Sequence, residues 1–270
     1  MAQSRQLTTD DGVRIGYVEA GPADGPAVVL CHGICAAARQ FEADIAYFAG
    51  LGYRVIAPDL RAHGTSGSPP AAGGDFSIDR MARDMLAVLD DAGIAHVHWV
   101  GNSLGGIIGL AMLRDVPQRF ASFATFGTAY RLGLPGVAPR VMPMLYRAFG
   151  PGLLGRMTAA MTTSNPAGQK LIAEMIAGFD PGPGERIAAA VCAYDLAAAA
   201  QNYAGPVLVL RGGKDSAVNL ALGHTFAAMA QHPDFQRIDL ARAGHCANLD
   251  VPDELRGVLQ AFWRRAGAVP

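Results

Sequence analysis

Short apolar runs alternate with longer segments whose apolar residues recur at helical spacing along most of the chain. The short runs are rich in valine, isoleucine and aromatic residues, a composition typical of buried strands. We predict strands at Val13–Ala20, Ala27–Cys31, Tyr53–Ala57, His96–Val100, Ser122–Gly127, Val207–Arg211 and Gln236–Leu240. We predict helices at Arg39–Leu51, Ile78–Ala92, Leu104–Arg114, Leu220–Met229 and Pro252–Arg265. This order indicates an α/β fold with a mainly parallel sheet flanked by helices.

The alternation is interrupted once, between about residues 131 and 200. This segment is punctuated by proline and glycine, favours helix and contains no convincing strand. Five of the ten methionines fall in it, namely Met142, Met144, Met157, Met161 and Met175. Methionine is flexible and polarizable, so the group suits the roof of an adaptable apolar pocket, although each one singly is better explained by helix packing. We therefore expect a helical lid at 131–200, inserted between core segments 1–130 and 201–270.

Charge and composition narrow the classes of partner. Lysine and arginine number 22 against 23 acidic residues, giving a net charge of −1 with no block of either sign, so we expect no nucleic-acid partner and no polybasic membrane anchor. The N-terminus lacks the apolar region of a signal peptide, and no apolar run is long enough to cross a bilayer, which favours a cytoplasmic protein. The four cysteines show neither a disulfide framework nor a zinc pattern. A small-molecule substrate and a monomer or homodimer are expected.

The segment Gly101-Asn102-Ser103-Leu104-Gly105 matches G-x-S-x-G between a predicted strand and a predicted helix. Glycines on both sides relieve the crowding of a sharp strand-to-helix turn that projects a serine hydroxyl from the sheet edge. With 33 glycines in the chain the spacing alone is weak, and its position between strand and helix makes it specific. Ser103 is the predicted nucleophile.

A serine hydroxyl needs a base to accept its proton as it attacks. Of seven histidines, His245 alone stands directly after the last predicted strand and before the last helix, at the sheet edge where open α/β sheets bind ligands. Asp215 follows the strand after the lid and is the predicted carboxylate, while the alternative loop at 126–130 contains none. A solvated turn aspartate beside Lys214 is the competing interpretation of Asp215. Acyl transfer also needs oxyanion donors, for which we expect the amides of Leu104 and Ile34.

These motifs, together with His32-Gly33 and the stretch from Asp59 to Ser66, resemble the α/β-hydrolase superfamily over nearly the whole chain. The closest resemblance is to 3-oxoadipate enol-lactonase-like hydrolases and small carboxylesterases. It implies a mostly parallel eight-stranded sheet with an inserted helical lid. Haloalkane dehalogenases and epoxide hydrolases of this fold carry an aspartate at the position that Ser103 occupies here, so Ser103 favours an ester, lactone or thioester as substrate.

The expected activity is therefore that of a serine hydrolase acting through an acyl-enzyme on a small, mainly apolar molecule, without metal or organic cofactor. The same fold and triad also serve acyltransferases, cyclases and lyases, and a non-catalytic ligand receptor is a further alternative. The side chains expected to line the pocket are His32, Cys35, Tyr130, Met142, Met161 and Cys246. Arg131 or Arg140 could meet a substrate carboxylate, although a solvated position is the simpler expectation for each.

Overall fold

The computed structural model describes residues 2–70, 73–133, 150 and 152–268. Eight strands form one sheet in the order β1-β2-β4-β3-β5-β6-β9-β10. They are β1 (Gln3–Thr8), β2 (Arg14–Ala20), β3 (Ala27–Cys31), β4 (Arg54–Pro58), β5 (Val97–Asn102), β6 (Phe120–Phe126), β9 (Val207–Gly212) and β10 (Phe235–Leu240). β2 runs antiparallel to both its neighbours, and the strands from β4 to β10 are parallel. The predicted α/β class with a mostly parallel eight-stranded sheet is confirmed.

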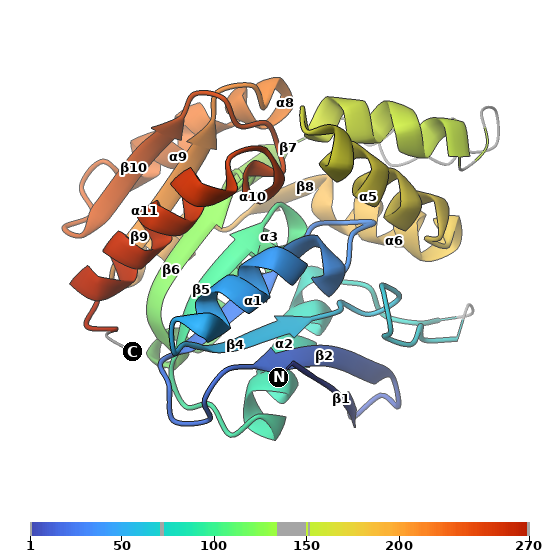
Figure 1. The fold of residues 1–270 in the computed structure, drawn as a ribbon, viewed down its shortest axis with the longest axis horizontal. Helices are drawn as coiled ribbons and strands as arrows, with labels where there is room; N and C mark the ends of the chain where they lie inside the picture. Colours follow the sequence, from blue (N-terminus) through green and yellow to red (C-terminus); the bar gives the residue numbers. More distant parts are fainter. Residues whose placement is uncertain (1, 71–72, 134–149, 151, 269–270) are drawn as a thin grey trace.

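Helices cover both faces of the sheet (Figure 1). One face packs against α1 (Glu42–Gly50) and α11 (Pro252–Arg265), and the other against α2 (Ile78–Asp91), α3 (Leu104–Asp115) and α9 (Leu222–Met229). Shorter turns of helix join these layers: η1 (Ala38–Phe41), η2 (Pro117–Arg119), α7 (Ala197–Asn202), α8 (Ser216–Asn219) and α10 (Ala247–Asp250). Large side chains such as Trp99 and Trp263 are fully buried in the two cores. The sheet is thus a rigid platform whose carboxyl edge carries the loops described below.

Several elements depart from the sequence prediction. The helix expected at Arg39–Leu51 is divided into η1 and α1. β1 was not expected, because its burial alternates between exposed and half-buried residues and it contains a single aliphatic residue, Leu7. It forms because it pairs antiparallel with β2 along its whole length, from Gln3 opposite Glu19 to Thr8 opposite Arg14. The helix expected at Leu220–Met229 begins two residues later, as α9, and Leu220 lies between α8 and α9 with 89% of its surface exposed.

The described residues between 131 and 195 form a separate layer over the carboxyl edge of the sheet (Figure 1). This insert contains a helix over 152–162, α5 (Pro166–Ala177) and α6 (Pro181–Val191). It also contains two three-residue strands, β7 (Arg131–Gly133) and β8 (Ala193–Asp195), paired antiparallel. The prediction that the segment holds no strand is therefore wrong. Three residues are too few for a period-two pattern to show in the sequence.

Candidate active site

Ser103 stands alone between the end of β5 and the start of α3. Its φ of 52° lies in the left-handed region that non-glycine residues rarely adopt. The turn is possible because its neighbours are small: a Cβ on Gly101 would lie 2.4 Å from the Gly106 nitrogen, and one on Gly105 would lie 2.2 Å from the Cys31 oxygen. The hydroxyl-bearing residue is thereby held in a strained turn at the carboxyl edge of the sheet.

His245 lies in the loop between β10 and α10, and Asp215 caps the start of α8. The Nδ1 atom of His245 is 2.9 Å from the Asp215 Oδ2 atom. Asp215 is 5% exposed, and its Oδ1 atom also accepts a hydrogen bond of 3.4 Å from the Val218 amide. A carboxylate accepts only, so Nδ1 carries the proton in this pair and Nε2 is left as a proton acceptor.

The loop that contains Ile34 is held by two buried histidines. His32 donates through Nδ1 to the Gly33 carbonyl at 2.7 Å and accepts from the Leu60 amide at Nε2. His63 accepts the Cys35 amide at Nε2, 3.1 Å away, and Cys35 itself has a φ of 59°. Burial lowers the pKa of His32 to about 4, and burial with the nearby His32 ring lowers that of His63 to about 3. Both rings are therefore neutral, as their acceptor roles require.

This loop lies against the predicted nucleophile. A Cβ on Gly33 would be 3.2 Å from the Ser103 Cβ, so the backbone passes close to the serine side chain. The Leu104 amide is in the first turn of α3, where amides have no partner within the helix. Ile34 follows the residue that passes close to Ser103, and Leu104 follows Ser103 itself, so the predicted oxyanion role of their amides is compatible with the backbone here.

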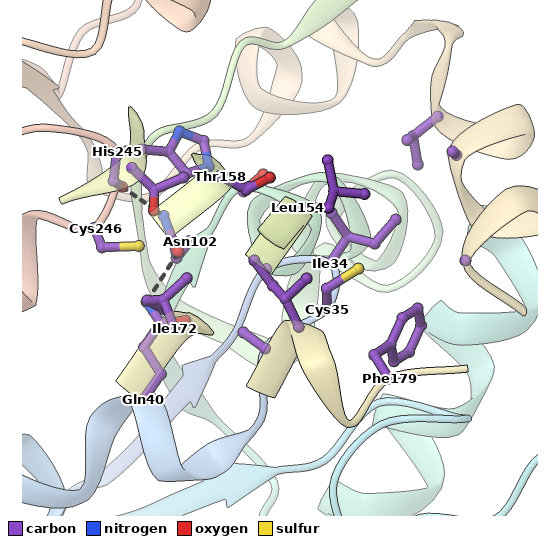
Figure 2. A pocket seen from close by; sticks show the side chains of 18 of the residues that line it. Ile34, Cys35, Gln40, Asn102, Leu154, Thr158, Ile172, Phe179, His245 and Cys246 are labelled. Carbon is purple, nitrogen blue, oxygen red and sulfur yellow. Dashed lines mark hydrogen bonds between the residues drawn. The ribbon is translucent and has the colours of Figure 1, made fainter. Parts of the chain in front are cut away.

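A cavity of about 360 Å³ opens beside these groups and is roofed by the insert (Figure 2). Ser103, His245, Asn102 and Gln40 line the end at the sheet. The insert supplies most of the apolar wall, with Leu132, Leu154, Ile172, Ile176, Phe179, Pro181, Ala188 and Val191. Among the described lining residues Glu185 is the one with a charged side chain. The volume is at the lower end of the range for small-molecule sites, and the wall suits an apolar group.

Only some of the side chains predicted for the pocket line the cavity. Cys35 and Cys246 line the cavity, and burial raises the pKa of each thiol to about 12, so both are protonated near neutral pH. Cys192, which was not predicted, also lines it. Met142 and Arg140 lie outside the described residues, and so does Met144.

Three pocket predictions are wrong in this structure, whereas the solvated position that was the simpler expectation for Arg131 is found, with 58% of its side chain exposed. His32 is 0% exposed and holds backbone groups instead of lining the cavity. Tyr130 is also fully buried, with its amide donating to the Thr225 Oγ1 atom. Met161 is 80% exposed, because its helix turns Leu154, Thr158 and Thr162 toward the cavity and Met161 outward. Arg131 pairs with Asp195 across β7 and β8 at 3.5 Å.

Two further classes of site were sought in the described part of the chain. No group of three or more histidine, cysteine, aspartate or glutamate side chains there could hold a metal ion. Over the same residues, no helix combines the length and apolar character needed to span a membrane.

Comparison with known proteins identifies relatives of this chain. The sequence profile described as the alpha/beta hydrolase fold matches residues 26–171. The chain is 26% identical to 3-oxoadipate enol-lactonase 2 of Acinetobacter baylyi, over 96% of each protein. It is 32% identical to bifunctional epoxide hydrolase 2 of Sus scrofa over 47% of this chain, but spans only 22% of that protein. A crystal structure of a hydrolase from Pseudomonas aeruginosa superposes with a TM-score of 0.85 at 24% identity, covering 97% of this chain and 98% of that one.

Proposed function

The chain belongs to the alpha/beta hydrolase fold family, and on that premise we propose that it is a serine hydrolase cleaving an ester, lactone or thioester. The observation that carries the proposal is that Ser103, in its strained turn, and His245, bonded to Asp215, line the same cavity. A nucleophile, a base and a group that orients the base are the three parts that acyl transfer from serine requires.

In the proposed mechanism His245 accepts the Ser103 proton at Nε2 as the serine oxygen attacks the substrate carbonyl. Asp215 fixes the tautomer of the ring and stabilises the imidazolium that forms. The Ile34 and Leu104 amides donate to the oxyanion, and His245 then protonates the leaving oxygen or sulfur. Water activated by the same histidine attacks the acyl-enzyme, which releases the acid and restores the free serine.

The cavity supports a small, mainly apolar and uncharged acyl group as the substrate. Its insert side is almost entirely hydrocarbon, and the described wall contains a carboxylate at Glu185 and no lysine or arginine. A substrate carboxylate would therefore lose water without gaining a cationic partner from these residues. We propose that residues 131–200 act as the lid whose side chains select the acyl group, while the strand-end loops perform the chemistry. The enol-lactonase among the relatives makes lactones suitable first substrates.

An active-site-directed fluorophosphonate tests the nucleophile directly. Wild-type protein should be labelled on Ser103, and Ser103→Ala should not be labelled, while heat-denatured wild type should also fail to react. A panel of uncharged p-nitrophenyl esters and aliphatic lactones should be hydrolysed by wild type, with kcat reduced at least about a thousandfold in Ser103→Ala and His245→Ala. Equal rates for the three proteins would refute the mechanism.

A further inference from the structure

The side chain of Asn102, the residue before Ser103, joins three loops at the carboxyl edge of the sheet. It is 1% exposed. Its Nδ2 atom donates to the carbonyl of His245 at 3.0 Å and to that of Phe126 at 3.2 Å. Its Oδ1 atom accepts from the Gln40 Nε2 atom at 2.9 Å. Figure 2 shows this side chain between His245 and Gln40 at the wall of the pocket. The side-chain amide of Asn102, which precedes Ser103, is thus bonded directly to the backbone of His245.

Gln40 connects the same amide to the far end of the histidine loop. Its Nε2 atom donates both to Asn102 and to the Asn248 Oδ1 atom, 3.2 Å away. Asn248 lies three residues beyond His245, and its Nδ2 atom donates to the Gln40 carbonyl at 3.0 Å and to the Asp44 carboxylate at 3.0 Å. The segment from His245 to Asn248 is therefore bonded at one end to Asn102 and at the other to Gln40, and these two side chains bond to each other.

The orientation of each amide in this group is determined by its neighbours. Asn102 faces two carbonyls with one end, and Asn248 faces a carbonyl and a carboxylate, so in both the nitrogen must lie there and the oxygen must face Gln40. Gln40 must then present its nitrogen to the two amide oxygens. Its Oε1 atom is left buried with no hydrogen-bond partner among the residues that the structure describes. A buried acceptor without a partner is unfavourable and calls for an explanation in each case where it occurs.

We propose that Asn102 and Gln40 are positioning residues that set the distance and angle between Ser103 and His245. The inference rests on the proposed function. Both N–H groups of Gln40 Nε2 are used to bond the oxygens of Asn102 and Asn248. The Gln40 Oε1 atom therefore points the other way, where it has no partner among the described residues. Loosening the group would let the histidine loop shift relative to the serine turn, because the two are separated by 142 positions in the sequence and the Asn102 amide bonds directly to the His245 carbonyl. A misplacement of about 1 Å in reacting groups is enough to cost a hundredfold in rate.

The test compares Asn102→Ala, Gln40→Met and the double variant with wild type. Methionine keeps nearly the volume of Gln40 and removes both its donors and the unpartnered oxygen. Each single variant should lower kcat for a neutral ester, and the second-order rate of fluorophosphonate labelling, at least about tenfold, with KM changed by less than about threefold. Since both residues act through one bonded group, the double variant should lose little more than Asn102→Ala alone.

Ser122→Ala is the matched control. It removes the buried hydrogen bond of 2.8 Å between Ser122 and His98, in strands β6 and β5. It should lower Tm and leave kcat and labelling unchanged, so that loss of stability is separated from loss of positioning. If Asn102→Ala fails to fold, Gln40→Met carries the same prediction with the asparagine in place.

The outcomes distinguish this inference from the proposed function. Wild type that is not labelled at Ser103 refutes the proposed function. Labelled wild type together with single variants that retain its kcat and labelling rate refutes the positioning role alone. Losses that multiply in the double variant also overturn it, because they show that Asn102 and Gln40 act independently.

Discussion

Acid should destabilise this fold through His32 and His63, the buried histidines that hold the loop containing Ile34. The pKa of His63 falls from an ordinary value of 6.5 to about 3 in the fold, and that of His32 falls to about 4. Between these values and 6.5 the unfolded chain binds protons that the folded chain does not, so stability is lost as pH falls through this window. The loss is about 1.4 kcal/mol per pH unit and begins only below the unfolded pKa of 6.5. Between pH 7.5 and pH 5 each histidine therefore lowers the free energy of unfolding by about 2 kcal/mol. The pair amounts to a large part of the 5–15 kcal/mol that typical domains possess.

The assay is urea unfolding followed by circular dichroism at pH 7.5 and pH 5, on wild type and His63→Gln. A glutamine oxygen can accept the hydrogen bond from Cys35 that the His63 ring accepts, and it does not titrate. The variant should therefore lose about 2 kcal/mol less than wild type over this pH interval. His96→Gln alters an exposed histidine and should follow wild type. If His63→Gln and wild type lose equal free energy, His63 is not the buried neutral group inferred from its contacts.

Three other perturbations follow from contacts of single side chains. Asp84→Ala removes the carboxylate that accepts from the Nε and Nη2 atoms of the fully buried Arg61. The free energy of unfolding should fall by about 3–5 kcal/mol. A loss below about 1 kcal/mol in urea unfolding would contradict this. Glu185→Lys should raise kcat/KM for an ester with a carboxylate on its acyl chain roughly tenfold relative to the uncharged analogue, and an unchanged ratio would mean that the substrate does not sense this position. Met161→Gln should leave kcat and Tm as they are, since its side chain is 80% exposed; a marked fall in kcat would show that Met161 contacts substrate after all.

The sequence contains enough to predict which residues meet at the carboxyl edge of the sheet. Ser103 directly follows β5, and Asp215 and His245 lie in the loops after β9 and β10; the ends of parallel strands meet at one edge of the sheet. Local pattern plus this rule is sufficient to bring them together. The Gln40 to Asn248 contact has no such signal, because 208 positions separate the two residues and each is a common polar residue on a short turn of helix.

The insert shows a different limit of sequence reasoning. The helix over 152–162 carries apolar residues on adjacent faces, with Leu154 toward the cavity and Met157 and Met161 exposed. Amphipathic spacing identifies a buried face only when the opposite face is polar. The prediction for Tyr130 fails for another reason: this residue lies four positions after the end of β6, and its amide donates to the Thr225 Oγ1 atom of α9, a contact set by the tertiary fold.

The strand pair β7 and β8 gives the insert its entry and exit at one place. Arg131 lies opposite Asp195 and Gly133 opposite Ala193, so the chain leaves the core and returns to it one strand spacing apart. A segment joined at two adjacent points can be exchanged for another of different length without stretching the sheet beneath it. If the insert selects the acyl group as proposed, chimeras cut at 133 and 193 would combine a foreign apolar wall with an unaltered sheet and its strand-end loops, so this strand pair is a natural crossover point for recombination.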